Sequence, residues 1–243
     1  MGYRRVAALG VAGCLALAGA ACGPARQDAP AAPSGGSDAA RAAVAEAYER
    51  SLSVSHTIET VAAGFTSRTA LDPATARGVL SVRRTFTDGT ELTADVRRIG
   101  PDTWISATGV DGVDADTWIH VESERTAGTM VAIDTDEIGE GITGSLILVR
   151  GAAPLYSGTL MVTGVRAARL GLAGTAATLT PFTATIDERG RLTSMTLEAN
   201  APVGLDATRT TISGFEAPVS VAAPPAADVV EGTDGMLAAF GIN

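Results

Sequence analysis

Cysteine is nearly absent from this sequence, which has only Cys14 and Cys22, both near the N-terminus. The rest of the chain can therefore form no internal disulfide bond, and its stability must come from a packed core. About 220 residues follow Cys22, which is enough for one domain. Aromatic residues are also scarce, at 4%, so such a core would be filled mainly by small aliphatic side chains.

Lysine is absent as well, so all 18 basic residues are arginine, against 27 acidic residues and a net charge of −9. If Arg4 and Arg5 are removed with a signal peptide, 16 basic residues remain against 27 acidic ones, a net charge of −11. Nucleic-acid binding depends on neutralising phosphates, and anionic membrane surfaces attract basic segments. We therefore expect no nucleic-acid partner and no attraction to a membrane by charge alone.

Motifs that carry chemistry are scarce. Histidine occurs only at His56 and His120, so a two-histidine metal site would need both. The acidic residues between Asp111 and Asp116 lack the spacing of a calcium loop, and Gly139-x-Gly141 lacks the rest of a nucleotide-binding fingerprint. There is no Gly-x-Ser-x-Gly elbow. We expect no enzyme activity, no metal and no cofactor, and we interpret His120 as a hydrogen-bonded structural histidine.

The N-terminus has the make-up of a secretory signal. Arg4 and Arg5 precede an uncharged apolar run from Val6 to Leu17, and small residues then lead to Cys22. A charged start, an apolar stretch and a small-residue exit are typical of a signal peptide. The run is shorter than the roughly 20 apolar residues that a spanning helix needs. We predict a signal peptide over residues 1–21.

The cysteine at the end of this signal indicates lipidation. Leu17-Ala18-Gly19-Ala20-Ala21-Cys22 resembles a bacterial lipobox, in which the cysteine after the cleavage site is acylated by groups such as palmitate. Val11-Ala12-Gly13-Cys14 is the better local match, but cleavage there would leave a short apolar region. The prediction is lipidation at Cys22, with Cys14 or an unlipidated signal as alternatives. The protein would then be lipid-anchored to the cell membrane, on its extracytoplasmic face.

Composition divides the rest of the chain into three parts. Residues 22–36 are rich in proline, alanine, glycine and serine, so we expect a flexible tether. Apolar residues at three- and four-residue spacing then predict an amphipathic helix that begins around Ser37. Residues 37–231 are expected to form one domain, and residues 232–243 a loosely ordered tail.

Alternating apolar residues predict strands through most of this domain. Asp88-Gly89 and the run from Asp187 to Gly190 lie between such strands, and both are typical of hairpin turns. The run from Asp134 to Arg150 is expected to be helical, although three glycines weaken it, and Arg166 to Leu172 could form a short helix. The other expected strands are Thr103–Ala107, Asp116–Val121, Tyr156–Val165 and Thr208–Phe215.

Three stretches carry a resemblance to a known family. They are Leu155-Tyr156-Ser157-Gly158-Thr159, the hairpin from Phe182 to Leu192, and Gly214-Phe215-Glu216-Ala217-Pro218-Val219-Ser220-Val221 with its following Pro224-Pro225. With the lipobox, they resemble the actinobacterial LppX/LprG-type lipoproteins, which are relatives of the LolA-like lipid carriers. The resemblance spans roughly residues 37–230. Glu216 stands where that family often has glycine, and residues 111–151 fit its pattern poorly.

The resemblance implies an α+β fold, a curved antiparallel half-barrel sheet with helices across its concave face, as in LolA-like proteins. In that family the gap between sheet and helices is an apolar cavity that holds lipid or glycolipid chains. It therefore implies an exported lipoprotein that binds such a ligand and carries or presents it at the cell envelope, with any transporter or carrier partner unknown. The alternative is a surface interaction or sensor lipoprotein with a filled core. The expected cavity-lining residues are Leu80, Val82, Leu92, Ala94, Val96, Trp104, Leu160, Val162, Met195 and Leu197.

Overall fold

Strands make up most of the described chain. The computed structural model describes residues 36–86, 88–109, 114, 116–127, 129–133, 145–162, 178–199, 207–238 and 240–242. All of them belong to one unit, residues 34–243. Cys14, Cys22 and the tether up to residue 35 lie outside the described residues, so the signal peptide and the lipidation site stay predictions. Within the described residues, no helix has the length and apolar character needed to cross a membrane.

The described residues contain few helical segments, of which only the first is long. They are α1 (Gly36–Leu52), η1 (Ser123–Thr126), η3 (Ala226–Asp228) and α4 (Asp234–Ala238). The strands are β1 (His56–Ala62), β2 (Phe65–Asp72), β3 (Arg77–Thr85), β4 (Glu91–Ile99), β5 (Asp102–Thr108), β6 (Trp118–Glu122), β7 (Leu146–Ala152), β8 (Leu155–Val162), β9 (Thr178–Ile186), β10 (Leu192–Leu197), β11 (Thr208–Ser213) and β12 (Val229–Glu231).

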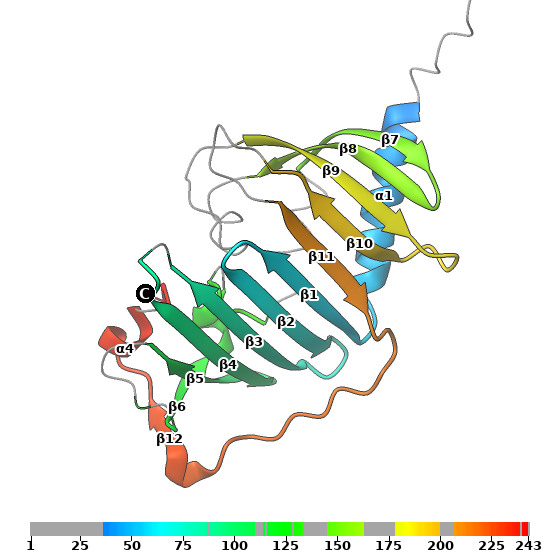
Figure 1. The fold of residues 1–243 in the computed structure, drawn as a ribbon. Coiled ribbons are helices and arrows are strands. Elements are labelled where there is room, and N and C mark those ends of the chain that lie inside the picture. Colours follow the sequence, from blue (N-terminus) through cyan, green and yellow to red (C-terminus); the bar gives the residue numbers. More distant parts are fainter. Residues whose placement is uncertain are drawn as a thin grey trace, which may run out of the picture. The chain divides into compact units, whose positions relative to one another are not determined.

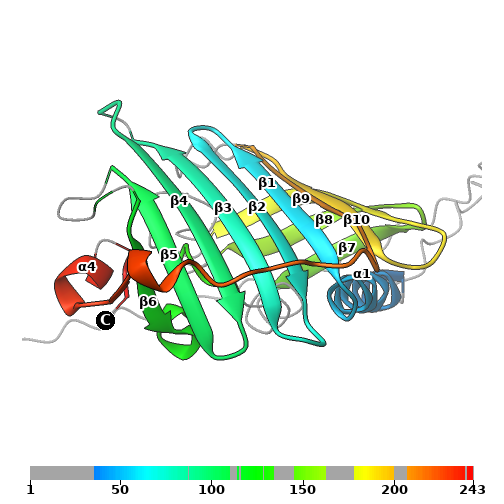
Figure 2. The same cartoon turned by 90° about the horizontal axis from the view of Figure 1, so that it is seen from below.

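These strands form one curved sheet, in the order β12-β6-β5-β4-β3-β2-β1-β11-β10-β9-β8-β7. Every neighbouring pair is antiparallel except β12, which lies parallel to β6. Figures 1 and 2 show the curvature from two directions. The predicted curved antiparallel sheet is therefore confirmed, whereas a set of helices across its concave face stays a prediction.

Both predicted hairpins are present, and short aspartate contacts shape their turns. Between β3 and β4, the backbone N–H of Thr90 donates to Asp88 Oδ1 over 2.9 Å. Between β9 and β10, the backbone N–H groups of Arg189 and Arg191 both donate to Asp187 Oδ1, each over 2.9 Å. Aspartate side chains that accept from a backbone N–H two residues on favour such turns.

The predicted helix from Asp134 to Arg150 is wrong in its described part. Residues 134–144 lie outside the described residues, and the next residues form strand β7 (Leu146–Ala152). Leu146 and Val149 are buried in one apolar cluster with residues of α1, and aliphatic residues such as these favour a strand. The possible short helix from Arg166 to Leu172 lies outside the described residues.

The C-terminal residues are not a loose tail. Helix α4 begins at Asp234, and the side chains of Leu237, Phe240 and Ile242 are 0%, 3% and 1% exposed. Those three pack in one cluster with strands of the sheet. An ordered C-terminus is favoured because packing these apolar side chains against the sheet removes them from water, whereas a disordered tail would leave them exposed.

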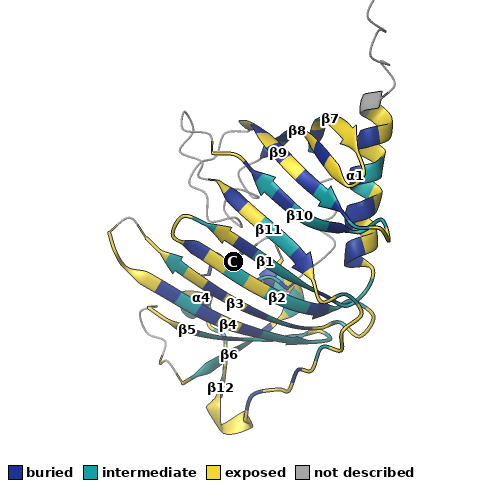
Figure 3. Cartoon of the chain, turned by 45° about the vertical axis from the view of Figure 1, so that its right-hand side comes forward, coloured by how far each residue is buried: buried dark blue, intermediate teal, exposed yellow. Residues whose placement is uncertain are grey.

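Side chains alternate between two faces of the sheet, as Figure 3 shows by burial. We call the face that carries Leu80 and Val82 the inner face, and the opposite face, which carries Ser81 and Arg83, the outer face. The strand registers extend this division from β6 to β7. The inner face is mostly buried and the outer face mostly exposed, as expected for a sheet covered on one side.

The packing around Gly158 explains why β8 has a glycine two residues after Tyr156. A Cβ atom there would lie 1.9 Å from the carbonyl oxygen of Leu148 and 2.9 Å from the ring of Phe182. No side chain fits between β7 and that ring, so the close packing of this part of the sheet requires glycine.

Candidate ligand-binding face

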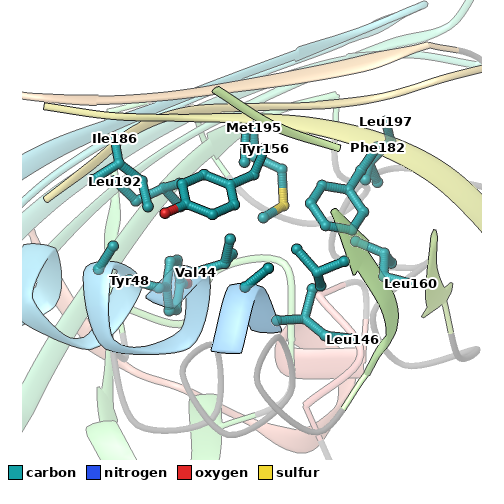
Figure 4. Packing of buried hydrophobic residues seen from close by; sticks show 14 of the residues in the cluster. Val44, Tyr48, Leu146, Tyr156, Leu160, Phe182, Ile186, Leu192, Met195 and Leu197 are labelled. Carbon is teal, nitrogen blue, oxygen red and sulfur yellow. The ribbon is translucent and has the colours of Figure 1, made fainter. Parts of the chain in front are cut away.

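The first apolar cluster of the inner face packs against helix α1. We call it the α1 cluster, and Figure 4 shows Val44 and Tyr48 of the helix facing Leu192 and Met195 of the sheet. Val44 and Tyr48 are 0% and 2% exposed. Ala40, Val44, Ala47 and Tyr48 recur at three- and four-residue spacing, which puts one apolar stripe of the helix on the sheet. The sheet side of the cluster consists of Leu146, Val149, Tyr156, Leu160, Val162, Phe182, Ala184, Ile186, Leu192, Met195, Leu197 and Ile212.

The second apolar cluster lies on the other half of the same face. We call it the α4 cluster, because Leu237 of α4 and the following Phe240 and Ile242 belong to it. Val131 and Ile133, which follow η1, complete the cover. The sheet side consists of Phe65, Leu71, Leu80, Val82, Leu92, Ala94, Val96, Ile105, Ala107, Ile119 and Val121.

A strip of smaller and more polar side chains separates the two clusters. We call it the seam, defined as the inner-face residues His56, Ile58 and Thr60 of β1, Ser67 and Thr69 of β2, and Thr208 and Thr210 of β11. Thr60 and Thr208 are buried, and the hydroxyl oxygens of Thr60 and Thr210 lie 3.3 Å apart. The inner face is thus two dry patches with hydroxyl groups between them.

The residues predicted to line a cavity fall into two groups. Leu80, Val82, Leu92, Ala94 and Val96 are buried in the α4 cluster, and Leu160, Val162, Met195 and Leu197 are buried in the α1 cluster. Their burial on one face follows the predicted alternation, while their role as cavity lining stays a prediction. Trp104 is different, because it pairs with Arg97 across β4 and β5 and so lies on the outer face. Its inclusion was wrong: Ile105, not Trp104, has the inner-face parity.

His56 is the least expected member of the seam. It is 1% exposed, and its Nδ1 lies 2.7 Å from the carbonyl oxygen of Val54. Burial lowers the pKa of His56 below the usual 6.5, although the bond to Val54 opposes this. Its Nε2 is buried and has no hydrogen-bond partner among the described residues; the same holds for the hydroxyl oxygen of Thr180. No sequence pattern assigned His56 to the inner face.

His120 lies on the outer face, so the two histidines form no common site. Its Nε2 is 2.9 Å from Asp102 Oδ1, and its Nδ1 is 3.0 Å from Glu231 Oε1. Partial burial disfavours the charged ring, but hydrogen bonds and attraction from Asp102 and Glu231 outweigh it and raise the pKa of His120 above 6.5. The predicted structural, hydrogen-bonded histidine is confirmed. No group of three or more metal-ligating side chains occurs in the described part of the chain.

The segment of residues 214–225 crosses the outer face between β11 and β12, as Figure 2 shows. At its start, the backbone N–H of Glu216 donates to the carbonyl oxygen of Ser55 over 2.8 Å. Further along, Arg97 Nη1 donates to the carbonyl oxygen of Ala222 over 3.1 Å, and its guanidinium carbon lies 4.3 Å from the centre of the Trp118 ring. We call residues 214–225 the crossing segment. η3 then connects it to β12, which pairs with β6 so that Glu231 lies opposite His120.

The outer face of β1–β4 carries an open depression of about 540 Å³. Among the residues around it are Glu59 and Arg68, whose side chains form an ion pair of 3.0 Å, and Ser81, which donates to Asp95 over 2.6 Å. These charged and hydroxyl groups satisfy one another. The depression therefore offers little to an apolar ligand, in contrast to the inner face.

No family model matches this chain, and no curated protein matches it. A solved structure does: the crystal structure of the Mycobacterium tuberculosis lipoprotein LppX. The match covers 76% of this chain and 99% of that chain, with 14% sequence identity and a TM-score of 0.44.

Proposed function

We propose that this protein is an exported lipoprotein that binds an apolar ligand, a lipid or glycolipid, over the inner face of its sheet and carries or presents it at the cell envelope. The observation that supports this most is the division of the inner face. Two apolar clusters have separate covers, from α1 and from the C-terminal residues, and of the seam between them only Ile58 packs against a cluster, the α1 cluster. An interaction protein with a filled core would be the alternative.

Binding would be non-covalent and driven by burial. Each CH₂ group removed from water contributes about 0.8 kcal/mol, so affinity would rise with acyl-chain length. The apolar residues that flank the seam, such as Met195 and Leu80, would contact the chains. No described side chain needs to react with the ligand, which fits a carrier rather than an enzyme.

The test is recovery of bound lipid from non-acylated protein. We expect native mass spectrometry to show an added mass that organic extraction removes, and a fluorescent fatty-acid probe to be taken up after extraction. Protein with no added mass and no uptake of the probe would contradict the proposal and leave the alternative.

A matched pair of variants on β11 locates the binding face. Thr210 lies on the inner face and pairs with Thr60, whereas its neighbour Thr211 lies on the outer face and pairs with Glu59. Thr210→Phe should fill the seam and reduce probe uptake at least tenfold, while Thr211→Phe should leave it unchanged. Equal effects of the two substitutions would place the ligand elsewhere.

The anchor is tested separately. We expect protein extracted from membranes to carry the mass of acyl groups, to lose it in Cys22→Ser, and to keep it in Cys14→Ser. The reverse result would move the lipidation site to Cys14, and loss in neither variant would show that the signal is not a lipoprotein signal. The tether of residues 22–36 would let the domain reach up to about 50 Å from the anchor.

A further inference from the structure

His56 occupies a neutral part of the seam. It is the first residue of β1 and pairs with Leu71 of β2 on the inner face. The inner-face positions of β1, β2 and β11 carry no acidic residue and no arginine. They are His56, Ile58, Thr60, Ala62, Phe65, Ser67, Thr69, Leu71, Thr208, Thr210 and Ile212. A charged headgroup would find no opposite charge on these three strands.

The hydrogen bond to Val54 determines which ring nitrogen of His56 carries the proton. A carbonyl oxygen can only accept, so His56 Nδ1 carries the proton and donates over 2.7 Å. Because burial lowers the pKa of His56, the ring is neutral near pH 7. In the neutral ring, Nε2 is then unprotonated and is an acceptor.

That acceptor is buried without a partner among the described residues. A buried acceptor with no donor costs about 1–3 kcal/mol, so a residue that is 1% exposed would ordinarily be supplied with one. Burying an uncharged apolar residue of similar size at this position would avoid that cost. The unused acceptor therefore points to a donor that arrives with a ligand.

We propose that Nε2 of His56 accepts a hydrogen bond from a hydroxyl group of the bound lipid. This rests on the proposed function and specifies it, because it selects neutral lipids with a free hydroxyl, such as partial glycerides or glycolipids. Fatty-acid anions and phosphodiesters present only acceptors, so they would gain nothing from His56. The hydroxyl groups of Thr60 and Thr210 lie about 13 Å further along the seam, so they could contact only a more extended polar headgroup.

The test compares an alcohol with an ether in which a methyl group replaces the hydroxyl proton, so that only the alcohol can donate. Hexadecanol and its methyl ether compete against a fluorescent fatty-acid probe on the non-acylated protein. We expect hexadecanol to bind about tenfold more tightly, as a lost hydrogen bond to a buried acceptor implies. His56→Phe should abolish this preference, because the phenyl ring offers no acceptor to the hydroxyl group. Thr180→Val, which removes the other unpartnered polar atom, should preserve the preference.

A second measurement needs no substitution. The ¹⁵N signal of His56 Nε2 should move on addition of hexadecanol and stay in place on addition of the ether. Equal affinities of the two probes for the wild-type protein, or an unmoved signal, would overturn the inference and assign Nε2 to water. If neither probe binds, the proposed function fails with it; if both bind equally, only this inference fails. Monohexadecanoyl glycerol and hexadecyl glucoside as further competitors distinguish the two lipid classes.

Discussion

The α1 cluster and the α4 cluster cover two halves of the same sheet face with segments that are far apart in the chain. In the first, one amphipathic helix of 17 residues precedes all the strands that it covers. In the second, the cover comes from residues after η1 and from residues 237–242. Each described cover packs against the apolar residues of its own half of the sheet. The polar strip is therefore a consequence of two separate cores rather than a defect in one.

Removing one large side chain from each cluster gives the largest expected effects. Phe182 and Phe240 are 1% and 3% exposed and belong to the α1 and α4 clusters, respectively. Phe182→Ala and Phe240→Ala should each lower the free energy of unfolding by about 3–5 kcal/mol, measured by urea denaturation. A loss below about 1 kcal/mol for Phe240→Ala alone would show that the C-terminal cover is only loosely attached.

The two histidines should give opposite pH dependences of stability. The pKa of His56 is lowered in the folded state, so the unfolded chain binds the proton first as pH falls below 6.5, and acid destabilises the fold. The pKa of His120 is raised, so its contribution is present below pH 6.5 and is lost as pH rises through its folded value. Urea midpoints measured across this range should show both slopes.

Single substitutions separate these slopes. His56→Phe should remove the loss of stability in acid, and His120→Phe should remove the loss on the alkaline side. Glu231→Gln should weaken the His120 effect without touching that of His56, because Glu231 contacts only His120 of the two. If His56→Phe left the acid slope intact, the neutral ring assigned to the seam would be wrong.

A substitution in the crossing segment should have a smaller effect on stability. Glu216 has a φ of +64°, a conformation that costs a residue with a side chain about 1 kcal/mol more than glycine. Its ion pairs to Arg189 and Arg191 are long, at 3.9 and 3.8 Å, and Glu216 is largely exposed. Glu216→Gly should therefore be more stable than Glu216→Ala by about 0.5–1 kcal/mol, by thermal unfolding. Equal stabilities would mean that the strain is relieved elsewhere.

The outer face provides the smallest effect and the control for the inner one. Glu59 and Arg68 form an ion pair at 3.0 Å with side chains that are 46% and 68% exposed. Such pairs contribute about 0.2–1 kcal/mol and are screened by salt. Arg68→Ala should fall within that range at low ionic strength and become neutral in high salt. A larger, salt-independent loss would contradict the division into a buried and an exposed face.

Local patterns predicted much of the fold. Alternation located β3, β4, β9 and β10 together with their hairpins, since aspartate and glycine mark those turns. It also placed nine of the ten expected lining residues on the inner face, which is a matter of parity. The error at Trp104 is one of parity by a single residue, because Thr103 to Ala107 can be read in either phase until a partner strand fixes it.

Long-range packing could not be predicted in the same way. The strand β7 was mistaken for a helix, because Leu146 to Val149 is a continuous aliphatic run without alternation, although Ile147 is exposed and the register shifts between Leu146 and Leu148. The hairpin of β1 and β2 was missed, although Ile58, Thr60 and Val61 favour a strand. The division into two clusters depends on which distant segments cover which strands, and no spacing along the chain contains that information. That Nε2 of His56 is an acceptor can be recognised only from the structure, because it depends on the hydrogen bond between Nδ1 and Val54.

The short parallel strand β12 has a consequence for the order in which this protein is completed. Glu231 reaches back across 111 residues to His120, and the side chains that finish the α4 cluster follow it in the chain. During synthesis and export from the N-terminus, the α1 half can assemble as soon as β11 emerges. The other half must wait with an open apolar surface until residues 237–242 arrive. The apolar side chains on the sheet side of the α4 cluster are therefore completed last, by the final residues of the described chain.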